Sequence, residues 1–259
     1  MAGIKQLVVL RRKAGLTRQE FFDYHYRVHG AISTAPNPRE TPQKYFQTHF
    51  EDSAFHANGP DISLNAHPSW AFSDDITELY FESEEHLQRV FQSDWVREKV
   101  GPDGVNFSDF SSVIPMFVEE KSLSRFDSEA SQDINPRESS RVSVYFVSTA
   151  AGFSDLDKLV LSFSESLHRH ASEGVRAVVV NTPAQISFDM RKYFGGSNSP
   201  KFDLIFTVYL KGSAQQSEIR KAQINFEREV ASFINLEMCW IAFGERAVIL
   251  DQSEKIKAC

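Results

Sequence analysis

The chain of 259 residues is long enough to bury a large hydrophobic core, so it does not need the disulfides that stabilise small secreted domains. Its 24% charged and 41% hydrophobic residues are close to the average for soluble globular domains, which excludes a disordered or fibrous chain. The formal net charge of -7 argues against nucleic acid and against an anionic membrane surface as partners. Because the short apolar run LVVL fits neither a signal peptide nor a membrane-spanning helix, and only two cysteines are present, we expect a cytoplasmic protein.

The first 120 residues predict the element order β-α-β-β-α-β. Residues 4–12 are typical of a strand, and residues 17–32 of an amphipathic helix that begins with a capping box between Thr17 and Glu20. Strands are expected at 45–50, 76–81 and 111–120, with a helix from Ser83 between the last two. This is the split βαβ order of a ferredoxin-like unit.

The rest of the chain repeats this order after a linker. Residues 121–140 are rich in Ser, Asp and Glu and predict a solvated linker. Within residues 141–259 we expect strands at 142–149, 174–181, 202–210 and 238–250, helices at 154–170 and 213–232, and a loop at 182–200. A four-stranded sheet with helices on one face leaves its other face bare, and a second such sheet covers it. The predicted fold class is therefore α+β, with two tandem ferredoxin-like βαββαβ units packed sheet to sheet as an α+β barrel within one chain.

A long segment at residues 51–75 interrupts the first unit. Its prolines and glycine disfavour regular structure, while its embedded aromatic residues predict an ordered flap. On this flap, His67 and Trp70 are candidates to cover a bound aromatic ligand, and a flap packed for stability alone is the alternative.

Three stretches of the first unit resemble a known family: RRKAGLTRQEFFDYHYRVHGAI, ITELYFESEEHLQRVF and NFSDFSSVIPMFVEE. Within residues 4–120 they are similar to the EthD-domain family of dimeric α+β barrel proteins, whose hallmark is a helix with two spaced histidines. The resemblance implies a ligand cleft between sheet and helices. Relatives on this fold include cofactor-free decarboxylases, dehydratases and cyclases of fungal and bacterial polyketide pathways, cofactor-free oxygenases and some haem proteins. The second half has His168 and His170 instead of the spaced pair, so we expect one active site, in the first half.

His25 and His29 are the leading catalytic candidates. They lie four residues apart on the apolar stripe of the predicted helix, where imidazoles need an explanation. The spacing also occurs in zinc sites, but no third ligand follows at a useful offset, so we expect no metal. Each histidine is a candidate general acid or base, and the alternative is a structural role at the helix end.

Further candidates lie on the strands. Tyr45 and His49 share one strand face, and we favour the arrangement in which this face points at the helices and brings His49, a third catalytic candidate, opposite His25. Glu78 and Tyr80 also share a face, and Glu78 either orients a histidine or is a paired structural acid. Arg12 is a candidate to bind a substrate carboxylate, or is a solvated surface residue.

Together these features favour an enzyme of secondary metabolism that needs no cofactor. We expect a lyase or a cyclase, namely a decarboxylase, dehydratase or cyclase. It would act on a polyketide-like aromatic or polyketone acid by histidine acid–base catalysis. Two alternatives stay open, a non-catalytic binding module for an aromatic small molecule and a cofactor-free oxygenase on the same fold. A homodimer of the two-unit chain also stays open.

Overall fold

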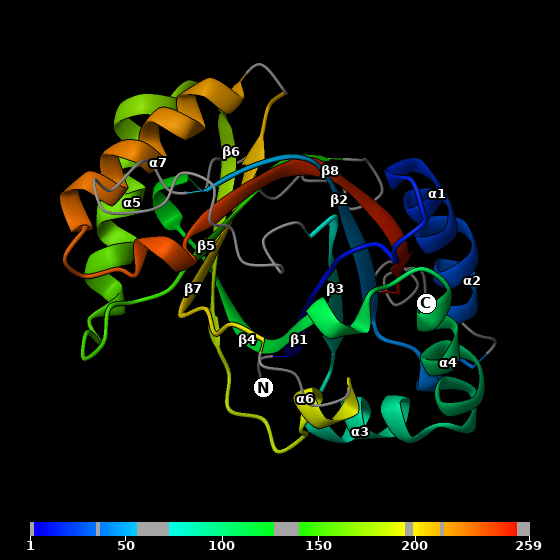
Figure 1. Cartoon of the computed structure of the whole chain (residues 1–259). Coiled ribbons are helices and arrows are strands. Elements are labelled where there is room, and N and C mark those ends of the chain that lie inside the picture. The colour runs from blue at the N-terminus through cyan, green and yellow to red at the C-terminus, as the bar shows by residue number, and fades with distance from the viewer. Residues whose placement is uncertain are drawn as a thin grey trace.

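Two four-stranded antiparallel sheets join into one closed barrel (Figure 1). The computed structural model describes residues 3–34, 37–55, 73–126, 140–194, 199–212 and 215–252. The first sheet consists of β1 (Ile4–Leu10), β2 (Lys44–Phe55), β3 (Asp75–Phe81) and β4 (Ile114–Ser122). The second consists of β5 (Ser140–Val147), β6 (Val175–Pro183), β7 (Leu204–Leu210) and β8 (Trp240–Asp251). The order around the barrel is β1-β3-β2-β8-β5-β7-β6-β4, so the β2–β8 and β4–β6 pairs connect the two sheets.

The helices cover the outside of the barrel in two groups on opposite sides (Figure 1). The first half contributes α1 (Arg18–Asp23), α2 (Gly30–Ser33), α3 (Glu84–Gln92) and α4 (Gly101–Asp103). The second half contributes α5 (Leu156–Ala171) and α7 (Gln216–Val230) on the other side, and α6 (Met190–Tyr193), which lies beside α3. The predicted pair of tandem ferredoxin-like units, packed sheet to sheet in one chain, is confirmed. No helix among the described residues is long and apolar enough to cross a membrane.

The predicted helix at residues 17–32 changes its winding in the middle. It begins with the predicted capping box, in which Thr17 and Glu20 satisfy each other's backbone N–H groups. A π-helical turn at Tyr24–His29 then separates α1 from α2. The wider turn leaves the carbonyl of His25 accepting both the Gly30 N–H and the side chain of Gln47 at 3.0 Å. Irregular turns of this kind are frequent at functional sites.

Several predicted boundaries are corrected by strand pairing. β1 ends at Leu10, and β2 continues to Phe55 because its last residues pair with β8, so the first residues assigned to the flap are strand. Residues 56–72, with His67 and Trp70, lie outside the described residues. β4 continues into the predicted linker as far as Ser122, and the predicted loop at 182–200 contains α6.

The alternation of side chains along the strands divides the core into three clusters. One fills the barrel interior and includes Leu7, Phe50 and Trp240. A second packs the outer face of the second sheet against α5 and α7. The third lies between the first sheet and its helices and includes Phe21 and Phe107. The second cluster contains four fully buried large aromatic side chains, namely Tyr145, Phe163, Phe206 and Phe226.

Candidate functional site

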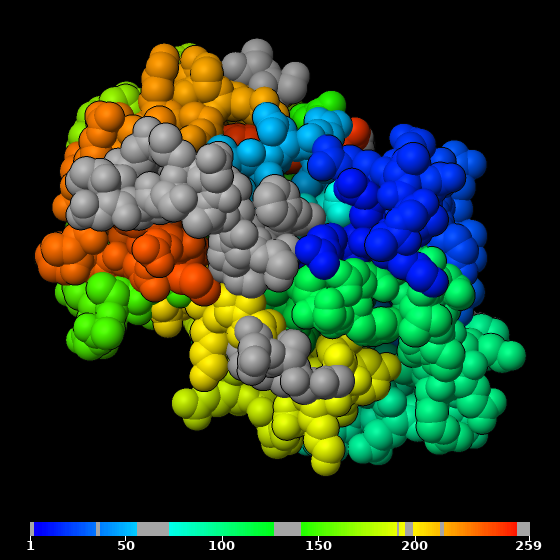
Figure 2. All heavy atoms as spheres, in the orientation of Figure 1, coloured from blue at the N-terminus to red at the C-terminus, as the bar shows by residue number. Residues whose placement is uncertain are grey.

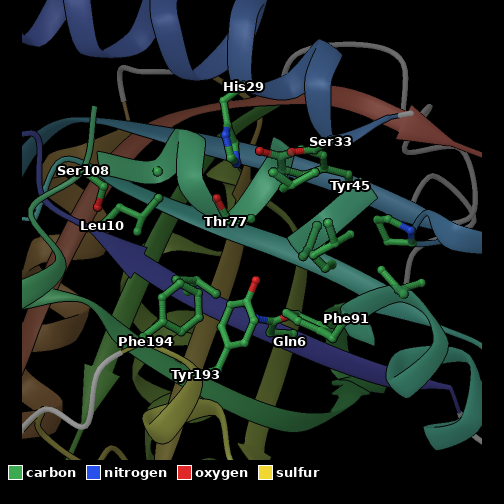
Figure 3. A pocket seen from close by; sticks show the side chains of 18 of the residues that line it. Gln6, Leu10, His29, Ser33, Tyr45, Thr77, Phe91, Ser108, Tyr193 and Phe194 are labelled. Atoms are coloured by element: carbon green, nitrogen blue, oxygen red, sulfur yellow. The ribbon is translucent and has the colours of Figure 1, made fainter. Parts of the chain in front are cut away.

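A cavity of about 400 Å³ lies between the outer face of the first sheet and the helices of the first half. His29 reaches into it from one side, and Tyr193 and Phe194 lie on the opposite side (Figure 3). Its polar lining includes His25, His29, Tyr45, Thr77, Gln6 and Ser108, and its apolar lining includes Leu10, Leu79, Phe91, Val96, Phe107 and Phe110. A mostly apolar cavity with a few polar groups is typical of a site for a small organic ligand.

His29 is held at the edge of the cavity by Asp103. Its Nδ1 lies 2.8 Å from Asp103 Oδ2, and Tyr24 Oη donates a hydrogen bond of 2.7 Å to the other carboxylate oxygen. Burial alone raises the pKa of Asp103, but hydrogen bonds from Tyr24, His29 and Asn106 bring it below its ordinary value. The carboxylate is therefore ionised and accepts a hydrogen bond from the Nδ1–H of His29, which leaves the Nε2 lone pair of His29 as the basic atom.

His25 is buried deeper, between the helix and β2. Its Nε2 lies 3.3 Å from Tyr45 Oη, which also accepts a hydrogen bond of 2.6 Å from Gln47 Nε2. The ring of Phe107 stacks on the His25 imidazole at 4.8 Å. Tyr45, Gln47 and His49 all face the helices, as favoured from the sequence, and the alternative with this strand inverted is excluded.

Burial keeps these imidazoles uncharged at neutral pH. It lowers the pKa of His25 to about 3, and burial together with the nearby His25 lowers the pKa of His29 to about 4. Burial also raises the pKa of the Tyr45 hydroxyl. The cavity thus offers a neutral base and a neutral hydroxyl donor within one apolar space.

His49 lies behind the cavity rather than on its lining. It stacks on Phe22 with ring centroids 4.2 Å apart, and its Nε2 lies 3.6 Å from Asp75 Oδ2. His25 Nδ1 lies 3.6 Å from Asp75 Oδ1. Within the described part of the chain, His25, His49 and Asp75 form a group that could hold a metal ion. Each side chain offers one ligand atom, and these three atoms lie within 4.8 Å of one another.

Three candidates from the sequence lie elsewhere. Glu78 and Tyr80 point into the barrel interior, where Glu78 pairs with Lys5 at 2.8 Å and with Arg246 at 3.0 Å, so neither residue belongs to the histidine site. The register of the two strands is the cause. Gln47 faces the helices and is paired with Thr77, so Thr77 faces the helices too. Side chains alternate along a strand, so Glu78 and Tyr80 face the opposite side, the barrel interior. Arg12 forms an ion pair with Asp74 at a separate polar hollow, away from the histidines.

Important residues of this site carry no local signal in the sequence. Asp103 follows Gly-Pro in a segment without helical periodicity, and Asp75 stands at the end of a polar stretch that is typical of an exposed loop. Tyr193 and Phe194 come from the second half, in a segment that predicts a loop. Figure 2 shows this second-half segment, in yellow, lying against the green helical segment of the first half. Only the tertiary fold brings these residues to the histidines.

Comparison with known proteins finds one family domain in the first half of the chain and a shared fold over nearly its whole length. Residues 13–111 match the EthD domain. A solved structure of an anthrone oxidase-like protein has 11% sequence identity and a TM-score of 0.51, and the similarity covers 97% of this chain and 95% of the other. For a protein provisionally named a chlorite dismutase the identity is 14% and the TM-score 0.51, with 93% of this chain and 94% of the other covered.

A more distant structure, a provisionally named monooxygenase from Lactobacillus acidophilus NCFM, has 9% identity and a TM-score of 0.46 over 97% of each chain, too low to carry an argument. No curated protein matches the sequence. At these identities the structural similarities show a shared fold and leave the reaction open. Residues 13–111 thus match the EthD domain, within a chain that has the fold of the dimeric α+β barrel proteins over nearly its whole length.

Proposed function

We propose that this chain is an acid–base enzyme that moves a proton to or from a carbon atom of a flat aromatic or polyketide-like acid. Decarboxylation, dehydration or cyclisation would follow from that proton transfer, and no cofactor is required for it. The observation that carries the proposal is the His29–Asp103 pair at the edge of an apolar cavity.

The pair has the properties of a positioned general base. Asp103 fixes the tautomer of His29, so the unprotonated Nε2 is available to take a proton from a bound ligand. When the imidazole becomes charged, the same carboxylate stabilises it, as the buried acid does in hydrolase triads. The mostly apolar lining lowers the polarity around the pair and strengthens this interaction.

Tyr45 supplies the complementary group. Its side chain lines the cavity, and its Oη already accepts a hydrogen bond from Gln47. An enolate or phenolate oxygen forming on the ligand would accept a hydrogen bond from the Tyr45 hydroxyl, which stabilises charge that is absent from the ground state. The size of the cavity, about 400 Å³, suits a ligand of two or three fused rings.

The test measures proton transfer to carbon directly. Aromatic polyketide acids are incubated with the protein in D2O, and deuterium incorporation, loss of carbon dioxide and loss of water are followed by NMR and mass spectrometry. We expect His29→Gln and Asp103→Asn to lower the rate by ~10²-fold or more with the fold intact. The matched control is His168→Gln, an exposed histidine of the second half. Full rates in both site variants would contradict the proposal.

A cofactor-free oxygenase is the second candidate, because one structure with this fold is an anthrone oxidase-like protein. The same base would generate a carbanion or phenolate, and dioxygen would then react with it. Strict dependence of conversion on dissolved oxygen would favour this reaction over the lyase or cyclase. Recovery of every tested ligand unchanged but bound would instead indicate a non-catalytic binding protein.

A further inference from the structure

A second polar group lies behind the cavity, where the start of β3 meets the helix of His25. It consists of His25, His49 and Asp75, which come from three different elements. Asp75 Oδ1 is 3.6 Å from His25 Nδ1, and Asp75 Oδ2 is 3.6 Å from His49 Nε2. Both separations are too long for hydrogen bonds but short enough for a shared ligand.

Two of these atoms are buried without a partner. His25 Nδ1 and Asp75 Oδ2 make no hydrogen bond, although the His25 and Asp75 side chains are only 1% and 0% exposed. Buried polar atoms are almost always paired, because an unpaired one loses its contacts with water and gains nothing in return. The arrangement therefore calls for a species that binds both atoms.

We propose that His25 Nδ1, His49 Nε2 and the Asp75 carboxylate bind a divalent first-row transition-metal ion. Two neutral imidazoles and one carboxylate form a donor set that such ions favour over magnesium. With metal–ligand bonds of about 2.0–2.1 Å in a tetrahedral site, neighbouring ligand atoms lie roughly 3.4 Å apart. The two separations of 3.6 Å thus need only a small contraction, and the wider gap between the imidazoles closes by rotation of His49, whose side chain is 16% exposed.

Gln47 is placed to complete the site and to connect it with the cavity. Its Oε1 lies 3.2 Å from His49 Nε2, so this oxygen is the fourth donor once the His49 proton moves to Nδ1. An ion on His25 Nδ1 leaves the proton of that ring on Nε2, 3.3 Å from Tyr45 Oη. Tyr45 Oη then receives two hydrogen bonds, from His25 and Gln47 Nε2, so its own proton is left for another acceptor.

The proposed site differs from a zinc site formed by His25 and His29, whose spacing on the helix also occurs in zinc proteins. His29 Nδ1 is already occupied by Asp103 at 2.8 Å, and His29 is not part of the three-residue group. The ligands of the proposed ion therefore lie on three elements, which no sequence motif connects.

The test is metal binding by the whole chain, without any substrate. Protein freed of metal by chelation is titrated with zinc by calorimetry and with cobalt by visible absorption, and magnesium is titrated in parallel. We expect one zinc ion per chain, a cobalt spectrum with nitrogen ligation, and no magnesium binding. Asp75→Asn should weaken zinc binding by ~100-fold or more, since loss of outer contacts alone costs up to that amount.

Matched variants separate the proposed site from other histidines. His49→Phe removes a ligand but keeps a ring on Phe22, so it tests the site if Asp75→Asn does not fold. His29→Gln and the exposed His168→Gln should bind zinc like the unaltered chain. Absence of stoichiometric zinc binding would overturn the proposal, as would undiminished binding in His49→Phe. Loss of binding in His29→Gln would assign the ion to the helical pair and would overturn it too.

Discussion

Replacing Glu78 by glutamine is expected to lower the free energy of unfolding by about 3 kcal/mol. Glu78 lies inside the barrel with its side chain 3% exposed, and it pairs with Lys5 at 2.8 Å and Arg246 at 3.0 Å. Both cations are themselves buried. The substitution removes one negative charge and leaves two buried positive charges without full compensation, while the volume of the side chain hardly changes.

Two separate estimates give this same loss in the free energy of unfolding. Removing one partner of a buried ion pair costs about 3–5 kcal/mol. We expect the low end of this range because both cations retain another partner in the variant. Lys5 still contacts Glu120 at 2.8 Å, and the Arg246 guanidinium still lies over the Phe46 ring at 3.6 Å. Independently, burial alone would raise the pKa of Glu78, but Lys5 and Arg246 bring it from 4.5 to about 2. That difference corresponds to about 3 kcal/mol of stabilisation by the ionised form.

Glu120→Gln is the matched control. Glu120 Oε2 is also 2.8 Å from Lys5 Nζ, but its side chain is 40% exposed. Exposed ion pairs contribute about 0–1 kcal/mol, because water screens both charges. The two glutamates thus contact the same ammonium at the same distance and differ in burial.

The assay is urea unfolding at neutral pH, followed by tryptophan fluorescence and circular dichroism, with free energies taken from midpoint and slope. Glu78→Gln should unfold at a clearly lower urea concentration than Glu120→Gln. If the two variants agree within about 1 kcal/mol, burial does not determine the strength of these pairs, and the reasoning is refuted.

The remaining predictions concern pH, a thiol and the cavity wall. Because the folded-state pKa of Glu78 is lowered, its stabilisation is present above 4.5 and is lost as the pH falls towards about 2, so acid unfolding curves of the unaltered chain and Glu78→Gln should converge over that window. Burial raises the pKa of Cys239 to about 12, so in Cys259→Ser protein iodoacetamide should modify Cys239 only after unfolding, as mass spectrometry would show. Rapid modification of the native form would contradict this. Tyr193→Ala should weaken binding of a flat aromatic dye by ~10-fold in a fluorescence titration, whereas the exposed Leu161→Ala should not.

The fold could be predicted because its signals are local. Capping at Thr17, alternation along the strands and the repeated element order all depend on neighbouring residues, and they define two ferredoxin-like units. Boundaries were less accurate where pairing partners decide them. β2 continues to Phe55 because β8 lies beside it, and nothing in residues 51–55 alone indicates that partner.

The site could be predicted only in part, for the same reason. The spacing of His25 and His29 marks one wall of the cavity, but their acidic partners Asp75 and Asp103 come from positions far along the chain. Alternation groups Glu78 with Tyr80 correctly, yet it does not say which face of the strand points into the barrel. That choice depends on the register between two strands, which a single sequence does not contain.

Duplication within one chain gives this barrel an asymmetry that two identical subunits could not have. In the second half, Tyr145 and Phe163 belong to a tightly packed cluster between sheet and helices, whereas the corresponding space of the first half holds the cavity. The second half instead supplies α6, which Met190 anchors as a buried residue and which brings Tyr193 to the cavity of the first half. We therefore expect the two halves to have divided their roles, with the histidine site in one and part of its wall in the other. On this basis a change in ligand preference should be obtainable by substitutions in residues 190–194 that leave the histidines untouched.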